Sequence, residues 1–355
     1  QQKSPKDAVL NLLLGYQAER AGELPTALTH FDAAYAANPA FLQAVRKMSA
    51  IEIRQGNYDA ADARVSKLEA QIEQSFPSLF LRARLEYERP NGDLEKAKKA
   101  LALVLKLPAG SVRQSDRALT LELTAKIARR EGKVDEAIDA LSKAARLDNR
   151  NAELLSLLGE LYFEKNEYDR ALAQIRQLEK DGKTSPELLV LKADCFYRMS
   201  QPKKSLSIIT EAKAKYPKAA SIRLYEGDLL TETRSYDLAE AAYLKAIELQ
   251  PLEVSTQLKL AKLLMAQSKI EEAKTLLESK IKANPNDSDL LIGYAQMRKQ
   301  LGDIGGGEAD YVPAKTHYEK ALKLNASSVV ARLELVDVLV QLKDSKRAKV
   351  ELSKV

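Results

Sequence analysis

The sequence predicts an all-α protein, built as a solenoid of stacked helix pairs. Small residues recur every 34 positions, as at Ala171, Ser205, Ala239 and Ala273. Between them, apolar residues follow the helical period, and short polar breaks separate one helical stretch from the next. A fixed period of this length is typical of repeat architectures, in which each repeat buries its apolar face only against its neighbours.

The same spacing appears at both ends of the chain. Ala27 and Ala61 are 34 residues apart, and so are Ala314 and Ala348. Prolines in one shared register are Pro39, Pro217, Pro251 and Pro285. Two helices approach closely only where side chains are short, so we expect the small residues to lie where paired helices cross.

With the small residue taken as position 20, the first repeat covers 8–41 and follows a tail of residues 1–7. Residues 8–355 then form a single array of about ten repeats, of which the last is incomplete. Because the chain starts at Gln1 rather than Met and stops inside a repeat, we expect it to be part of a longer chain.

Each repeat is predicted to contain two helices joined by a short turn. Glycine or asparagine in the turn ends the first helix through a left-handed residue. The Asp or Glu that follows lies in the first turn of the next helix, where the helix dipole favours a negative charge. The clearest turns are residues 20–24, 55–58, 91–94, 131–134 and 165–168.

Extra residues interrupt the period in three places. The longer intervals between small residues are 61–97, 97–137 and 273–314. We expect the first to lengthen a helix near 76–77. The second, a loop insertion near 107–117, forms either a loop or a longer helix start, and the third forms a loop over 302–313. The last of these is rich in glycine, which favours a loop.

The composition is that of an ordinary globular protein, with 45% hydrophobic and 30% charged residues. The 56 basic and 50 acidic residues give a net charge of +6, which makes nucleic acid an unlikely partner. The only cysteine, Cys195, excludes an internal disulfide and is expected to be a buried thiol. No apolar run approaches the length of a membrane span.

The sequence lacks recognisable catalytic and metal-binding patterns. His30 and His317 are far apart, and neither has a second ligand at metal-binding spacing. The segment 182–185 resembles the end of a phosphate-binding loop, but Gln177 stands where that motif requires glycine. We therefore predict a protein that is not an enzyme, with no cofactor and no metal site.

The order of residues within the repeats resembles the tetratricopeptide repeat (TPR) family. The first repeat carries Gly15, Ala27, Phe31, Ala34 and Pro39 at the positions where that family has small, small, aromatic, small and proline residues. The family's tryptophan is missing, since the chain has no Trp. The resemblance covers nearly the whole chain and implies a right-handed superhelix of helix-turn-helix repeats.

In this family the first helix of each repeat lines a concave groove. The corresponding positions are basic in the second to fourth repeats and aromatic or acidic in the fifth to seventh. The partner-binding residues that the resemblance implies are Arg46, Lys47, Arg54, Arg82, Lys126, Arg129, Arg130, Phe163, Asp194, Tyr197, Tyr225 and Asp228. An extended or helical segment of a protein partner, acidic where it meets the arginines, would fit such a groove. Alternatively, these residues are solvated charges and packing contacts between helices.

The predicted function is a non-catalytic scaffold or adaptor for protein–protein interaction. The lysine-rich composition, the absence of an initiating Met and the single cysteine indicate a bacterial protein with a periplasmic location, and a cytoplasmic location is the alternative. Long arrays of the family that the chain resembles occur in envelope assembly and polysaccharide secretion, so we expect a role there. Two other functions stay open at this point. A regulatory or substrate-recruiting part of a larger enzyme predicts a catalytic domain in the same reading frame, and a polyanion-binding module predicts steep salt dependence.

Overall fold

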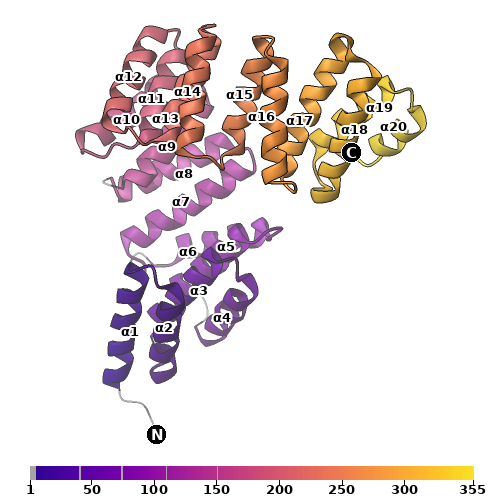
Figure 1. Ribbon diagram of the computed structural model, residues 1–355. Coiled ribbons are helices and arrows are strands. Elements are labelled where there is room, and N and C mark those ends of the chain that lie inside the picture. Colours follow the sequence, from indigo (N-terminus) through magenta and orange to yellow (C-terminus); the bar gives the residue numbers. More distant parts are fainter. Residues whose placement is uncertain (1–4, 40, 73–74, 109, 150) are drawn as a thin grey trace. The chain divides into compact units, whose positions relative to one another are not determined.

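The chain folds into helices throughout the part that the structure describes (Figure 1). The computed structural model describes residues 5–39, 41–72, 75–108, 110–149 and 151–355. These ranges contain no strand, which confirms the prediction of an all-α solenoid. Internal contacts divide the chain into two compact units, unit 1 (residues 1–183) and unit 2 (residues 184–355). The 34-residue period runs across this boundary, so the single array of residues 8–355 stays a prediction.

The helices of the described part of unit 1 are α1 (Pro5–Arg20), α2 (Leu24–Ala37), α3 (Leu42–Arg54), α4 (Tyr58–Gln71), α5 (Phe76–Glu88), α6 (Leu94–Lys106), α7 (Gln114–Arg130), α8 (Val134–Leu147), α9 (Ala152–Glu164) and α10 (Tyr168–Lys180). The sequence predicts a tail over residues 1–7, whereas α1 already begins at Pro5. Proline suits this position, because the first residue of a helix needs no N–H partner within the helix.

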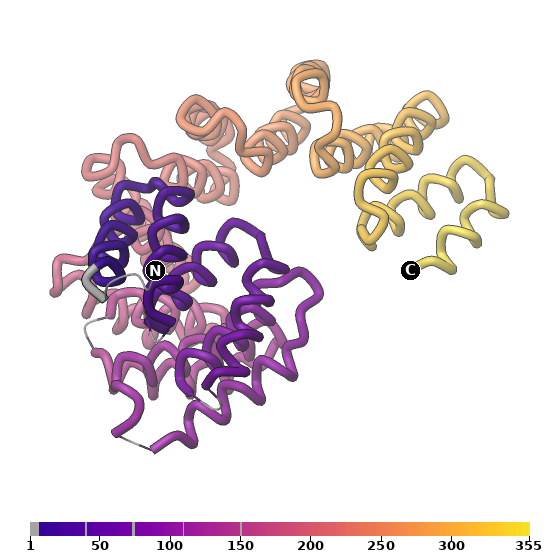
Figure 2. Tube along the Cα trace, turned by 90° about the horizontal axis from the view of Figure 1, so that it is seen from below, coloured from indigo at the N-terminus to yellow at the C-terminus, as the bar shows by residue number. Residues whose placement is uncertain are grey.

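The helices of unit 2 are α11 (Pro186–Arg198), α12 (Pro202–Lys215), α13 (Ala220–Glu232), α14 (Tyr236–Leu249), α15 (Val254–Ala266), α16 (Ile270–Ala283), α17 (Ser288–Leu301), the π-helix η1 (Gly302–Gly306), α18 (Glu308–Leu324), α19 (Val329–Gln341) and α20 (Ser345–Leu352). In both units each odd-numbered helix packs against the even-numbered helix that follows it (Figures 1 and 2). Odd-numbered helices also contact the next odd-numbered helix, as in α3 with α5 and α11 with α13.

The small residues of the 34-residue period lie in the interior of these helix pairs. Each occupies the first or second turn of an even-numbered helix. All are fully buried except Ala348, which is 5% exposed, and the set is Ala27, Ala61, Ala97, Ala137, Ala171, Ser205, Ala239, Ala273, Ala314 and Ala348. This confirms the expectation that short side chains mark the places where paired helices meet.

A glycine and an aromatic ring provide a second close contact in some pairs. A Cβ atom added to Gly227 would lie 2.5 Å from the ring of Tyr243, and one added to Gly15 would lie 2.5 Å from the ring of Phe31. The missing side chain on the odd-numbered helix therefore leaves room for the ring of the even-numbered helix.

The turns within the pairs contain left-handed residues, as predicted. Gly22, Gly56, Asn91, Gly132 and Asn166 all have a positive φ. Four further turns reach the same conformation at residues that give no sequence signal, namely Ser200, Arg234, Ser268 and Lys343.

The first insertion lies elsewhere than the sequence predicts. The turn between α5 and α6 covers residues 89–93, whereas the corresponding turn after α9 covers only 165–167. The extra pair therefore lies in this turn and not near 76–77. The second insertion lies between the end of α6 and the end of α7, and α7 has 17 residues compared with 13 in α9, in agreement with the longer helix start that the sequence allows.

The glycine-rich insertion is predicted as a loop over 302–313, whereas the structure makes it helical on both sides of a kink, at which Gly305 has a φ of 133° and Gly307 a φ of 53°. It forms η1 and the start of α18, with Pro313 inside that helix. The Tyr311 ring packs on Gly302, where an added Cβ would lie 2.6 Å from the ring, and the Tyr311 hydroxyl donates to Asp303 at 2.7 Å. These two contacts hold the segment against α18, because a glycine backbone lets the ring approach.

The buried small residues generate a prediction for stability. Ala239→Leu should lower the free energy of unfolding by about 1–3 kcal/mol, because the longer side chain overpacks the contact between α13 and α14. Ala241→Leu is the matched control, since Ala241 is exposed on the same helix. Urea denaturation measures both, and equal stability of the two variants would contradict the packing argument.

Candidate partner-binding sites

Most residues that the family resemblance assigns to the groove already contact a neighbouring helix. The Lys47 ammonium on α3 lies 2.8 Å from Glu19 Oε2 on α1. The Arg129 guanidinium on α7 pairs with Glu160, at 3.0 Å, and with Glu164, both on α9. These ion pairs join successive odd-numbered helices, so they hold neighbouring repeats together.

Arg82 is buried and has several polar partners within the chain. The sequence places it on the groove surface, but the structure leaves its side chain only 6% exposed. Its guanidinium binds both carboxylate oxygens of Glu69, at 3.0 and 2.7 Å, and lies 2.5 Å from Asp62 Oδ1 and 2.9 Å from Ser66 Oγ. Arg82 therefore ties α5 to α4 and has no free donor face for a partner.

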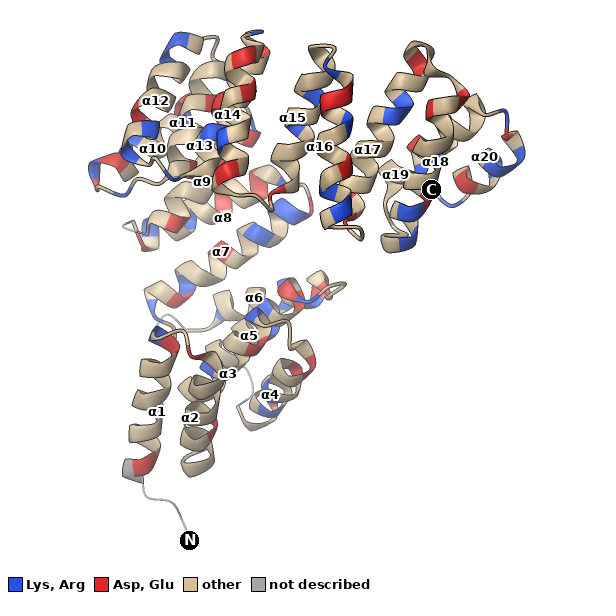
Figure 3. Cartoon of the chain, viewed as in Figure 1, with Lys and Arg blue, Asp and Glu red and all other residues tan. Residues whose placement is uncertain are grey.

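Two other basic residues of unit 1 are also engaged. Lys126 Nζ lies 2.6 Å from Glu122 Oε1 on its own helix. Arg130 donates to the backbone carbonyl oxygen of Tyr87 at 2.9 Å and lies over the ring of that residue. Acidic and basic residues are interspersed along the helices of both units (Figure 3). The predicted basic groove is thus largely neutralised by internal partners.

Arg46 and Arg54 are different, because neither has an ion-pair or hydrogen-bond partner within the residues that the structure describes. Arg54 is exposed at the end of α3, whereas Arg46 is partly buried. Phe163 packs against Tyr168, with ring centroids 5.5 Å apart, and so belongs to the contact between α9 and α10. Of the unit 1 candidates, Arg46 alone combines partial burial with unpaired donors.

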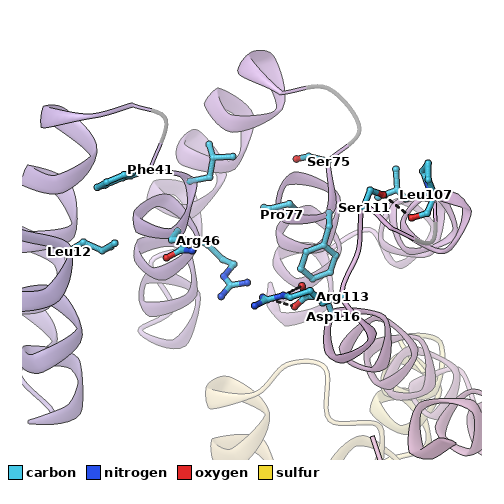
Figure 4. Close-up of a pocket in the computed structure, with 13 residues that line it drawn as sticks. Leu12, Phe41, Arg46, Ser75, Pro77, Leu107, Ser111, Arg113 and Asp116 are labelled. Carbon is cyan, nitrogen blue, oxygen red and sulfur yellow. Dashed lines mark hydrogen bonds and ion pairs between the residues drawn. The ribbon is translucent and has the colours of Figure 1, made fainter. Parts of the chain in front are cut away.

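Arg46 lines a pocket of about 750 Å³ in unit 1 (Figure 4). The pocket lies between α1, the first turns of α3 and α5, and the segment that leads into α7. Figure 4 shows the Arg46 side chain directed toward the ion pair of Arg113 and Asp116, in which Nε and Oδ2 are 2.9 Å apart. Most of the remaining wall is apolar, and Leu12, Leu42, Phe41, Phe76, Pro77, Leu107 and Pro108 form it.

Local sequence explains why these side chains meet. Ser75 caps α5 by accepting a hydrogen bond from the backbone N–H of Ser78, and Pro77 occupies the first turn. The second insertion leads into α7 with the Arg113–Asp116 pair. The sequence does not predict Phe41 and Phe76 as site residues, because they precede the positions that face the groove in the family. The insertion at 107–117 is the one signal that points to this region.

A second pocket, of about 370 Å³, lies in unit 2. The structure brings together four of the predicted residues there, namely Asp194, Tyr197, Tyr225 and Asp228, and adds Tyr243 from α14. The Tyr243 hydroxyl donates to Asp228 Oδ1 at 2.8 Å, and burial raises the pKa of Asp194 above its ordinary value. This pocket gathers acidic and aromatic groups where the unit 1 pocket gathers apolar groups and a cation.

Cys195 lies in the interior of unit 2. The Cys195 thiol is fully buried, as expected, and burial raises its pKa to about 12. Within the described residues no cluster of three or more His, Cys, Asp or Glu side chains has an arrangement that could hold a metal ion. The same part of the chain has no helix that combines the length and apolar character needed to cross a membrane.

Comparison with protein families identifies two matching segments. Two models of the tetratricopeptide repeat match residues 128–195 and 190–253. Among curated proteins, cellulose synthase operon protein C of Pseudomonas fluorescens is 23% identical over 69% of this chain and 20% of its own length. The mitochondrial import receptor subunit TOM70 of Saccharomyces cerevisiae is 27% identical over 48% of this chain and 29% of its own length. The chain thus spans less than a third of either relative.

Solved structures share the fold. The crystal structure of yeast Tom70 matches with a TM-score of 0.50 at 16% identity, covering 98% of this chain and 90% of that one. A tetratricopeptide repeat protein from Parabacteroides merdae matches with a TM-score of 0.53 at 19% identity, covering 75% and 99%. At these identities the likeness concerns the fold alone.

The ion pairs of Arg82 predict a structural role. Arg82→Ala should lower the free energy of unfolding by roughly 3 kcal/mol, because it leaves partly buried Glu69 without its partner and Asp62 with only the longer contact to Arg89, at 3.3 Å. Arg54→Ala, which removes an unpaired and exposed arginine, should change it by less than about 0.5 kcal/mol. Urea denaturation followed by circular dichroism compares the two, and equal stability would show that Arg82 does not hold α5 to α4.

The same network predicts a pH dependence. The hydrogen bond from Arg82 holds the pKa of Asp62 below its ordinary value of 3.8. The folded state therefore favours the ionised carboxylate, and this contribution to stability is present at neutral pH and is lost as the pH falls through the lowered folded pKa. Between neutral pH and about pH 3, the free energy of unfolding should fall less in the Asp62→Asn variant than in the original chain. Urea titrations at both pH values measure this, and an equal loss in both proteins would exclude the contribution.

Proposed function

Because this chain belongs to the tetratricopeptide repeat family, we propose that it is a non-catalytic scaffold that binds an extended or helical segment of a protein partner. The single observation that carries the proposal is the unit 1 pocket, where apolar side chains surround the unpaired Arg46. Its volume of about 750 Å³ is in the range of sites that bind small ligands or a few side chains.

The lining of the pocket specifies the kind of segment that fits. Phe41, Leu42 and Pro77, which are partly exposed, offer apolar surface to a leucine or aromatic side chain of the partner. Arg46 has donors left for a carboxylate, and a guanidinium holds a carboxylate through paired hydrogen bonds. The preferred segment therefore carries an apolar residue next to an aspartate, a glutamate or a terminal carboxylate.

Fewer basic residues are available to an acidic partner than the sequence predicts. Arg82 and Arg129 are held by carboxylates of the chain itself, so their release would cost the ion pairs that join α4 to α5 and α7 to α9. The same pairing disfavours a polyanion-binding module, which needs a continuous track of unpaired cations. Binding centred on Arg46 leaves the stack of helices intact.

For the biological setting, we propose bacterial envelope assembly or polysaccharide secretion, with a periplasmic location. Support comes from the similarity to cellulose synthase operon protein C over 69% of the chain. A regulatory part of an enzyme complex is the second candidate, since the bifunctional NrfFG subunit of a formate-dependent nitrite reductase complex from Haemophilus influenzae is 31% identical over 112 residues. Affinity capture by the whole chain in its own periplasmic extract distinguishes the two, because each setting supplies different partners.

The binding proposal predicts a selection result. Phage display of random peptides against the whole chain should enrich an apolar residue beside Asp or Glu. Arg46→Glu should lower the affinity for the selected peptides by about tenfold or more, because it replaces a charge-assisted contact by repulsion. Fluorescence anisotropy measures the affinity.

Two variants serve as controls for this measurement. Arg54→Glu tests the broader basic groove, because Arg54 is unpaired but lies outside the pocket. Arg176→Glu makes the same change of charge at an exposed position of α10. Equal weakening by all three variants would indicate general electrostatic attraction, and unchanged affinity of Arg46→Glu would contradict the proposed site.

A further inference from the structure

The unit 2 pocket carries a charge opposite to that of Arg46. It lies where the C-terminal halves of α11 and α13 meet α14, and all of its residues belong to the described part of unit 2. Its lining contains three carboxylates, Asp194, Asp228 and Glu232, and one guanidinium, that of Arg198. Three negative groups and one positive group give the lining a formal charge of −2.

The three carboxylates differ in the number and length of their hydrogen bonds and ion pairs. Asp228 accepts a hydrogen bond from Tyr243 at 2.8 Å and pairs with Lys259 at 2.5 Å. Within the described residues, the polar contacts of the Asp194 carboxylate are long, at 3.4 Å to Arg198 Nε and 3.4 Å to the Tyr225 hydroxyl. Both exceed the usual length of a strong hydrogen bond. Asp194 therefore retains capacity for a closer donor.

Glu232 is the second acceptor with free capacity. It lies at the end of α13, is exposed, and has no ion pair within the described residues. Because Glu232 and Asp194 line the same pocket, a cation that enters can approach one carboxylate that is partly buried and one that is exposed. Charge-assisted hydrogen bonds to both would be shorter and stronger than the contacts that Asp194 has now.

Aromatic side chains complete the lining. Tyr197, Tyr225 and Tyr243 all border the pocket, and aromatic rings attract cations through their electron-rich faces. The rings and Leu229 also offer apolar surface to the methylene stem of a lysine or arginine. The volume of about 370 Å³ suits one side chain rather than a folded segment.

We propose that the unit 2 pocket receives the side chain of a lysine or arginine from a bound polypeptide, with the cationic group between Asp194 and Glu232. The proposal rests on the scaffold function but not on Arg46, so either site can fail without the other. A long free polyamine fits less well, because the unsatisfied carboxylates lie in one pocket and do not form a track.

The test uses the whole chain with fluorine-labelled tyrosine, observed by fluorine NMR. The Tyr197 signal is identified by its loss in Tyr197→Phe. The probes are the capped amides of lysine, arginine and norleucine, and spermidine. The lysine and arginine amides should shift the Tyr197 signal in a saturable way, whereas norleucine, which matches the lysine stem without the charge, should not.

Two variants connect the shift to the pocket. Glu232→Gln should weaken binding of the lysine amide by about two- to fivefold, the effect of one exposed ion pair. Glu187→Gln removes the same charge from an exposed position near the start of α11 and should leave the affinity unchanged. Circular dichroism confirms that both variants are folded, which is expected because both positions are exposed.

Each opposite result overturns the proposal. Equal shifts with norleucine would mean that the pocket does not select for charge. Equal weakening by Glu232→Gln and Glu187→Gln would assign the effect to the overall field of unit 2. Saturation by spermidine without saturation by the amino-acid amides would assign the pocket to a free polyamine. A Tyr197 signal that responds to none of the probes would exclude a cation site.

Discussion

The contact of a short, buried side chain on each even-numbered helix with the odd-numbered helix of its pair is the constraint on which this structure depends. The residues from Ala27 to Ala348 that make this contact are buried in every described pair. In the same pairs, the rings of Phe31 and Tyr243 pack on glycines of the odd-numbered helix. The left-handed turns between the two helices reverse the direction of the chain. The odd-numbered helices are then left with one face for their neighbours and one for solvent.

Polar side chains on the odd-numbered helices divide between two tasks. Lys47, Arg82 and Arg129 form ion pairs with carboxylates of neighbouring helices. Their charges therefore stabilise the packing of the helices. Arg46 and Glu232 have no such partner in the described residues, and each lines a pocket. On this view a binding site in a helical array is marked by unpaired charge beside apolar or aromatic surface, and not by the number of charges.

The sequence was sufficient for the fold because the fold depends on residue size at fixed spacing. It was insufficient for the site because Arg46 and Arg82 are the same residue type in similar repeat positions. What separates them is whether acidic groups on the preceding helix reach the guanidinium, as Asp62 and Glu69 do for Arg82. The corresponding residues on α2, 34 positions earlier, are Leu28 and Tyr35, so the helix that precedes Arg46 offers no carboxylate there. Similarly, the packing of the Tyr311 ring on Gly302 does not follow from the glycine content of this segment, which predicts only a loop.

The most direct test of the distinction between paired and unpaired charges is a crystal structure of the whole chain with a peptide selected against it. We predict a peptide carboxylate on Arg46 and an apolar side chain among Phe41, Leu42 and Pro77, with the Arg82 and Arg129 ion pairs unchanged. A peptide that lies along α5 and α7 and displaces those ion pairs would contradict it.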